Sequence, residues 1–221
     1  MSRIRLSRRH LTPLALVLAL SAAPWAAKAA RHGPAPLSDA DHALVDRAGD
    51  YLQGLTEAKA RFTQTDARGN VSQGTLYLHR PGKARFAYDP PSGLLVVADG
   101  HAVSIVNSQL RTFDRYPLWT TPLSIFLAKQ VRLDRGVSIT AVSKMADGFS
   151  ITARDGRKVA EGEISLTFTD SPMALVGWSV VDAQGNATRI RLADLDRSSG
   201  LSPSLFVLND PHPRKAKRPQ E

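Results

Sequence analysis

The chain has 221 residues, of which 43% are apolar and 22% are charged, and its formal net charge at pH 7 is +9. This length and composition fit one sizeable folded domain and exclude a highly charged, disordered chain. The sequence contains no cysteine, which excludes a disulfide, a thiolate nucleophile, a cysteine-bound metal and a lipid attached to sulfur.

The positive charge lies at the two ends of the sequence. The first 29 residues contain five basic residues and no acidic one, and residues 214–221 contain four basic residues and one acidic one. The central part is therefore close to neutral, so the high net charge does not indicate a nucleic-acid-binding surface. We expect residues 210–221 to form a basic, disordered tail, and we expect no nucleic-acid partner.

The N-terminal residues predict an export signal. Residues 1–10 carry four arginines, residues 11–23 form an apolar run too short to span a bilayer, and Ala27-Lys28-Ala29 resembles a cleavage site. We therefore predict that residues 1–29 are a signal peptide cleaved near Ala29, and that residues 30–37 are a loose leader. The adjacent Arg8 and Arg9 resemble a twin-arginine signal, so the Sec and Tat routes both stay open. The mature protein is expected to function outside the cytoplasm.

One amphipathic helix is predicted ahead of all the strands. Ser38 is a suitable N-cap, and Asp39 and Asp41 lie in the first turn, where acidic residues are favourable. The apolar residues at helical spacing are Leu44, Val45, Ala48, Tyr51, Leu52 and Leu55. This face covers either a filled core or a cavity, and the pattern fits both.

The rest of the chain consists of β-forming runs separated by short turns. The predicted strands span residues 57–66, 71–79, 84–88, 94–98, 102–107, 111–116, 137–144, 149–154, 163–169, 175–181 and 187–195. Turns such as Asp147-Gly148 are typical of hairpins. We therefore expect a mainly β protein with a single, strongly curved, up-and-down antiparallel sheet in one domain over residues 38–209.

A short helix is predicted to interrupt the strands. Thr121 and Pro122 are expected to be its N-cap and first helical residue, and Leu123, Phe126 and Leu127 share its apolar side.

The sequence contains no pattern that is typical of an enzyme. The six histidines form no pair at metal-ligand spacing, and there is no nucleophile elbow, Walker loop or Gly-x-Gly-x-x-Gly motif. Asp182, Asp194 and Asp196 fall at turns and strand ends, where aspartates usually cap the backbone. We predict a protein that is not an enzyme and holds no metal or cofactor.

A frame of residues stands out around the second and third predicted strands. It reads Phe62-x-Gln64, then Gly74-x-Leu76-x-Leu78-x-Arg80-Pro81-Gly82-Lys83-x-Arg85-Phe86-x-Tyr88-x-Pro90, then Asp99-Gly100. Alternation places Leu76, Leu78 and Arg80 on one face of their strand. Together with Thr121–Leu127, this frame resembles the LolA family of periplasmic carriers of outer-membrane lipoproteins, over roughly residues 38–208.

The resemblance implies an incomplete β-barrel of about eleven strands, with an N-terminal helix and a short helical lid over an apolar cavity. It implies that Arg80, which precedes a proline, acts as a latch that holds the lid closed by hydrogen bonds. The cavity that it implies for lipoprotein acyl chains is lined by Phe62, Leu76, Leu78, Phe86, Tyr88, Ile125, Phe126 and Leu127.

The resemblance also implies partners. In the family, an inner-membrane ABC exporter complex (LolCDE) loads the carrier, and a membrane-anchored receptor (LolB) unloads it. LolB shares the fold but carries a lipidated cysteine, so a sequence without cysteine favours the soluble carrier over the receptor. We expect this carrier to be a monomer. Two alternatives stay open: a LolA-like binder of another lipid or hydrophobic ligand or a lipoprotein sensor, and a structural envelope protein with a filled interior.

Overall fold

The computed structural model describes residues 37–129, 137–156, 162–197 and 200–210. The predicted signal peptide (1–29), and all but one residue each of the predicted leader (30–37) and tail (210–221), lie outside the described residues. No helix within these described ranges is both long enough and apolar enough to cross a membrane.

The helix α1 (Asp39–Gly54) begins where the sequence predicts it. The Ser38 hydroxyl accepts a hydrogen bond from the backbone of Asp41, and the Asp41 carboxylate accepts one from the backbone of Ser38. This reciprocal capping box satisfies backbone N–H groups that have no partner inside the helix. Val45, Ala48 and Leu52 are buried on the inner side of α1, as their spacing predicts.

All eleven predicted strands are present, and their ends lie within two residues of the predicted ones. The strands are β1 (Glu57–Thr65), β2 (Val71–His79), β3 (Lys83–Tyr88), β4 (Leu94–Asp99), β5 (Ala102–Asn107), β6 (Thr112–Pro117), β7 (Val137–Met145), β8 (Gly148–Asp155), β9 (Glu163–Asp170), β10 (Met173–Val181) and β11 (Ala187–Asp196).

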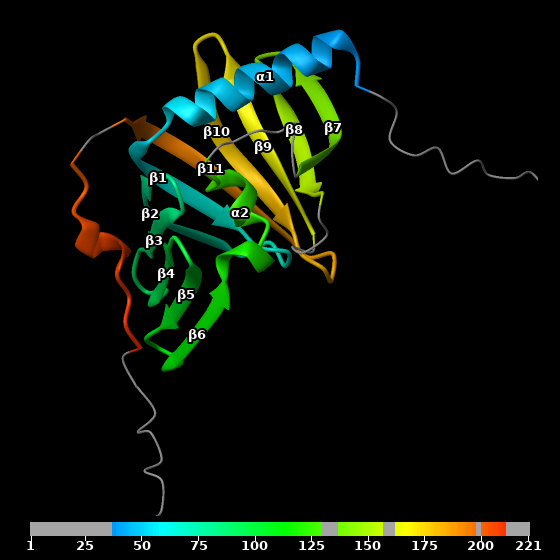
Figure 1. The fold of residues 1–221 in the computed structure, drawn as a ribbon. Coiled ribbons are helices and arrows are strands. Elements are labelled where there is room, and N and C mark those ends of the chain that lie inside the picture. The colour runs from blue at the N-terminus through cyan, green and yellow to red at the C-terminus, as the bar shows by residue number, and fades with distance from the viewer. Residues whose placement is uncertain (1–36, 130–136, 157–161, 198–199, 211–221) are drawn as a thin grey trace, which may run out of the picture. The chain divides into compact units, whose positions relative to one another are not determined.

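These strands form one antiparallel sheet in the order β6-β5-β4-β3-β2-β1-β11-β10-β9-β8-β7. Neighbours in sequence pair as expected for an up-and-down sheet, except that β6 and β7 do not pair among the described residues. Instead β1 pairs with β11, so that the first and last strands meet in the middle of the sheet. The curved sheet is therefore left open between β6 and β7 (Figure 1).

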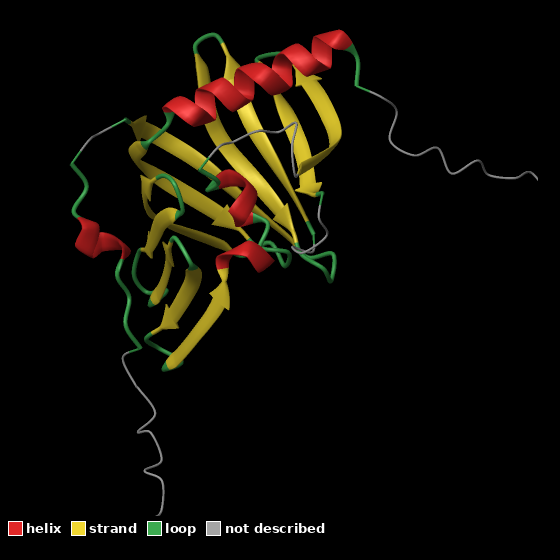
Figure 2. Ribbon diagram, viewed as in Figure 1, coloured by secondary structure: helices red, strands yellow, loops and turns green. Residues whose placement is uncertain are grey.

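Two short helices follow β6. They are the 3-10 helix η1 (Leu118–Thr120) and α2 (Leu123–Phe126), and α2 lies inside the curve of the sheet (Figure 2). The prediction of Thr121 as N-cap was wrong, since Pro122 occupies that position. The hydroxyl of Thr121 instead donates to the carbonyl of Leu118, 2.8 Å away, because η1 brings that carbonyl within reach. A second 3-10 helix, η2 (Pro203–Phe206), was not predicted.

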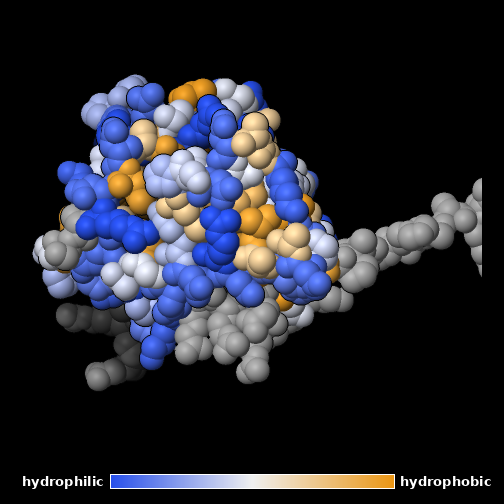
Figure 3. Space-filling model, turned by 90° about the horizontal axis from the view of Figure 1, so that it is seen from above, coloured by the Kyte–Doolittle hydropathy of each residue, from blue (hydrophilic) through white to orange (hydrophobic). Residues whose placement is uncertain are grey.

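The core lies between α1, α2 and the concave face of the sheet. Tyr51 of α1 meets Phe168 of β9 edge to face at 5.8 Å between ring centroids, and Arg47 forms an ion pair with Asp170 at 2.8 Å. These contacts fix α1 against the second half of the sheet. The surface on the α1 side is a mixture of hydrophilic and hydrophobic residues (Figure 3), as expected for a helix with one buried face.

Candidate functional site

Arg80 follows β2 and connects the two α-helices. Its Nη1 donates a hydrogen bond to the carbonyl of Leu52 in α1, and its Nη2 donates to the carbonyl of Ala128, just after α2, at 2.8 Å. The side chain is buried, with 7% of the residue exposed. We call this arrangement of Arg80 with the carbonyls of Leu52 and Ala128 the Arg80 bridge.

Backbone hydrogen bonds strengthen the same junction. The Arg80 amide donates to the carbonyl of Thr56 at 2.7 Å, and the Gly82 amide donates to the carbonyl of Leu127 at 2.8 Å. The turn after β2 is therefore attached to the segments that follow both helices. Gly82 has a φ of 81°, a conformation that glycine adopts without steric cost.

The Arg80 bridge joins a buried positive charge to neutral acceptors. The Leu52 carbonyl lies in the last turn of α1, where the helix dipole favours a cation. Burial lowers the pKa of Arg80 to about 10, so the guanidinium stays protonated at neutral pH. Its Nε is buried and has no hydrogen-bond partner among the described residues. Because no carboxylate within the described part of the chain balances the charge, desolvation offsets part of what the hydrogen bonds contribute.

The residues predicted to line a cavity lie together in the interior. Phe62, Leu76, Leu78, Phe86, Ile125, Phe126 and Leu127 are each at most 6% exposed and belong to one core cluster, with Tyr88 partly buried against it. They come from β1, β2, β3 and the α2 segment. The sheet thus brings the two separate parts of the predicted lining into one apolar region.

Aromatic rings connect this region from end to end. Phe62 lies edge to face with both Tyr88 and Phe86, at 5.0 and 5.7 Å between centroids. Phe86 in turn lies 6.0 Å from Trp178 of β10, which stacks on Phe126 of α2 at 5.3 Å. In this conformation, Phe126 therefore fills the space above Trp178.

Tyr88 gives the aromatic chain a polar end. Its hydroxyl donates a hydrogen bond to Oε1 of Gln64 at 2.6 Å. Burial raises the pKa of Tyr88 to about 12, although the hydrogen bond to Gln64 acts in the opposite direction. This hydrogen bond holds the Tyr88 side chain in one orientation.

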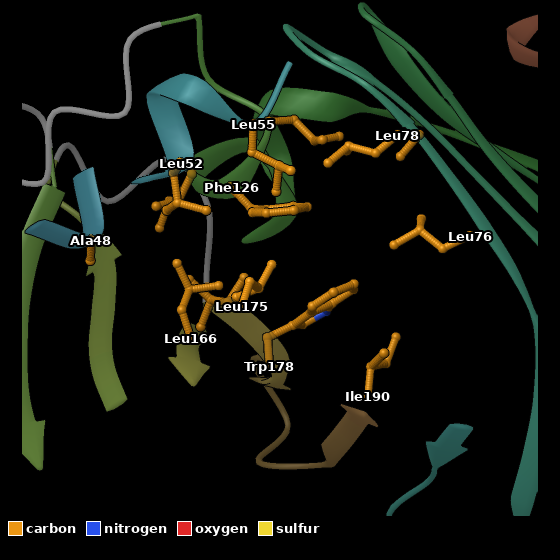
Figure 4. Close-up of a cluster of buried hydrophobic side chains, with 14 of the residues drawn as sticks. Ala48, Leu52, Leu55, Leu76, Leu78, Phe126, Leu166, Leu175, Trp178 and Ile190 are labelled. Atoms are coloured by element: carbon orange, nitrogen blue, oxygen red, sulfur yellow. The ribbon is translucent and has the colours of Figure 1, made fainter. Parts of the chain in front are cut away.

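Sequence reasoning missed the contribution of the second half of the sheet. Trp178, Leu166, Leu175 and Ile190 are buried and face Phe126, Leu52 and Leu76 across the interior (Figure 4). The bulge between Leu175 and Gly177 explains the omission of Trp178. Strict alternation from Leu175 would place Trp178 on the opposite face, whereas one extra residue restores it to the core.

Two open hollows are present in the described structure away from this lining. One, of about 500 Å³, lies along β9, β10 and β11 and includes Gly177, Arg189 and Arg191. The other, of about 330 Å³, lies between α1 and the β7–β8 hairpin and includes Leu44 and Met145. None of the predicted cavity residues lines either hollow.

The sequence profile described as "Outer membrane lipoprotein carrier protein LolA" matches residues 53–209. The chain belongs to the LolA family. This LolA-family protein is 25% identical over 168 residues to the outer-membrane lipoprotein carrier protein of Chromobacterium violaceum, covering 73% of this chain and 81% of that one. It is 27% identical over 194 residues to the protein of the same name from Leptothrix cholodnii, covering 83% and 82%.

The fold is similar to the solved structure of a LolA superfamily protein from Nitrosomonas europaea. It aligns with a TM-score of 0.42 and 9% identity, over 72% of this chain and 97% of that chain.

Proposed function

We propose that this protein is a periplasmic carrier that binds the acyl chains of lipoproteins leaving the inner membrane and delivers them to the outer membrane. Membership of the LolA family and the names of its relatives support this proposal. The observation that carries it is the Arg80 bridge, which connects α1 and α2 above an apolar interior. In this proposal the protein acts by binding and release, not as an enzyme.

The proposed cargo limits how tightly the protein can hold it. Burying an acyl chain contributes about 0.8 kcal/mol per CH₂ group. Several long chains, fully buried, would exceed the roughly 20 kcal/mol at which non-covalent affinity saturates. A carrier that must release its cargo therefore needs a site that opens and that leaves part of the chains incompletely buried.

We propose that α2 is the movable lid. It is one turn long, lies inside the curve of the sheet, and follows the edge strand β6. Displacing it would remove Ile125, Phe126 and Leu127 from the core and uncover Trp178 and Phe86. The space that these lid side chains fill would then accept acyl chains.

Arg80 is the proposed latch for this movement. Its side-chain hydrogen bonds connect α1 to the residue after α2, so moving α2 away from α1 must break at least one of them. Hydrogen bonds from a charged donor are worth about 1.5–3 kcal/mol each. That is enough to favour the closed form and small enough for cargo binding to reverse it.

The proposed partners are a LolCDE-type ABC exporter complex, which loads the carrier, and a LolB-type outer-membrane receptor, which unloads it. Export would use the signal peptide of residues 1–29, through the Sec or the Tat route, with cleavage near Ala29. The carrier would work as a monomer.

The decisive experiment is lipoprotein release from spheroplasts. Adding the purified mature protein should release newly made lipoproteins into the soluble fraction as complexes with it. Serum albumin at the same concentration is the control for non-specific binding of acyl chains. If the lipoproteins stay on the spheroplasts while mass spectrometry finds a different lipid in the purified protein, the cargo assignment is wrong.

A further inference from the structure

We propose that the groove along β9, β10 and β11 on the outer face of the sheet binds a phosphate group. The groove has a volume of about 500 Å³ and is open on one side. Trp178 and Ile190 also border it, but their side chains point into the core (Figure 4). They therefore contribute backbone to its floor, and the groove lies on the opposite face of the sheet from the proposed acyl-chain region.

Two arginines of β11 provide the charge. Arg189 and Arg191 are both exposed and alternate with the buried Ile190, so they project from the same face about 6.6 Å apart along the strand. Their cross-strand neighbours on β1 are Thr65 and Thr63, and those on β10 are Ser179 and Gly177. Each arginine is thus flanked on both sides by uncharged residues.

The lack of a counter-charge among the described residues distinguishes this pair from three other exposed arginines. Arg61, Arg115 and Arg154 each lie within 3 Å of a carboxylate oxygen, from Asp89, Asp99 and Glu163 respectively. Within the described residues, neither Arg189 nor Arg191 forms an ion pair. Two like charges side by side repel each other, and an anion bound between them would remove that repulsion.

The shape and the hydrogen-bonding groups of the groove suit a tetrahedral anion. The guanidinium groups offer paired N–H donors that match phosphate oxygens. The hydroxyls of Thr167 and Ser179, which also border the groove, supply further donors. The volume is large enough for a phosphate ester with a small substituent.

Gly177 keeps the floor of the groove free of a side chain. It lies at the bulge of β10, opposite Arg191. A Cβ atom at this position would come within 2.3 Å of the Ile190 carbonyl oxygen, far inside van der Waals contact. Glycine is therefore required at this point of the bulge, and it adds no side chain to the groove beside Arg191.

The phosphate has two possible sources: a phospholipid headgroup at a membrane surface, or a soluble phosphate ester. Both share the chemistry that the groove recognises. Two binding measurements separate them. The first uses vesicles of phosphatidylglycerol, with phosphatidylcholine vesicles for comparison, at fixed ionic strength. The second titrates soluble glycerol phosphate and follows the arginine side-chain Nε–Hε resonances by NMR.

The test variant is R189Q/R191Q, and the matched control is R68Q/R111Q, which removes the same charge from two turns. We expect the test variant to bind phosphatidylglycerol vesicles about tenfold more weakly than the unaltered protein, and the control to change less than twofold. Circular dichroism establishes that both variants are folded.

Each outcome has a definite meaning. Loss of vesicle binding in the test variant alone supports the site, with a lipid headgroup as the source. Saturable shifts of the Arg189 and Arg191 resonances with glycerol phosphate support it with a soluble ester as the source. An equal loss of vesicle binding in both variants would mean that net charge alone causes the effect, and it would overturn the proposal. The proposal is also overturned if the unaltered protein binds neither phosphatidylglycerol vesicles nor glycerol phosphate.

Discussion

Phe126 of α2 stacks on Trp178 of β10, with ring centroids 5.3 Å apart and ring planes inclined by 27°. The two residues are 52 positions apart in sequence: Phe126 lies in the segment between β6 and β7, and Trp178 lies in a later strand. The contact therefore connects the proposed lid to the half of the sheet that follows the opening.

This contact should appear as an energetic coupling. The variants F126L and W178L each remove the ring stacking, and the double variant completes the cycle. We expect a coupling of about 0.5–1.5 kcal/mol in the free energy of unfolding, because aromatic pairs contribute this much beyond their buried area. Urea denaturation of the four proteins measures it. Strictly additive effects would mean that the stacking contributes nothing specific.

Arg80→Leu should loosen α2 while leaving the fold intact. The substitution removes both hydrogen-bond donors from the carbonyls of Leu52 and Ala128. We expect amide hydrogen exchange at Leu127, whose N–H donates to Leu123, to accelerate by about tenfold or more, since charge-assisted bonds contribute about 1.5–3 kcal/mol each. Transfer of lipoprotein to a receptor should be impaired in the same variant.

Arg85→Leu is the matched control for that experiment. Arg85 also donates to a backbone carbonyl, that of Leu205 at 3.1 Å, but this carbonyl belongs to η2 rather than to the proposed lid. Exchange at Leu127 and lipoprotein transfer should both stay unchanged. The latch role is refuted if the two variants behave alike.

Gly74→Ala should disturb the aromatic chain at its start. A Cβ atom at position 74 would lie 2.3 Å from the Ala87 carbonyl oxygen and 2.7 Å from the Phe62 ring. Because neither strand can accommodate this without shifting, we expect a loss of about 1–3 kcal/mol in the free energy of unfolding. Gly69→Ala is a poor control because Gly69 has a positive φ; Gly54→Ala, with open space around its Cβ, is the better one.

Unfolding measurements under the same conditions test this expectation. Gly54→Ala should be neutral or slightly stabilising, since alanine is the better helix residue. A Gly74→Ala protein as stable as the unaltered one would show that Phe62 and the β3 backbone yield more easily than their packing indicates.

Tyr88 should make stability fall between pH 10 and pH 12. Its pKa is raised by burial from 10.0 to about 12, so the folded protein keeps the proton that the unfolded chain loses. The free energy of unfolding is therefore unaffected by Tyr88 below pH 10 and falls as the pH rises to about 12. The total loss is about 2–3 kcal/mol. Tyr88→Phe should flatten this part of the stability curve.

Tyr116→Phe provides the comparison, because Tyr116 is 49% exposed. Denaturation at pH 9 and pH 11.5 gives the change in free energy of unfolding for each protein. If the free energy of unfolding falls as steeply between these two pH values in Tyr88→Phe as in Tyr116→Phe, the pH dependence comes from groups other than Tyr88.

The sequence was sufficient to predict α1, the eleven strands and one face of the interior. Alternation in β2 and β3 predicted the burial of Leu76, Leu78 and Phe86 correctly, because these strands run without a bulge. The capping residues of α1 predicted its start, since the capping box is a local interaction.

The long-range features could not be derived in the same way. The pairing of β1 with β11 depends on how far the whole sheet curls, which no local pattern records. Trp178 was missed because the bulge at Leu175–Gly177 breaks the period of two. The five N–H donors of Arg80 could reach carbonyls of either helix or of both. Only the fold determines that the acceptors are Leu52 and Ala128.

The register that places Phe62 opposite Leu192 sets an order of events during biosynthesis. Every other pairing in this sheet joins strands that follow one another in the sequence, but one side of β1 must wait for the last strand to be translated. Until then Ala58, Ala60 and Phe62 belong to a sheet edge that is open to other chains. A nascent chain that stops short of β11 thus presents an aggregation-prone template, and such high contact order is expected to slow folding.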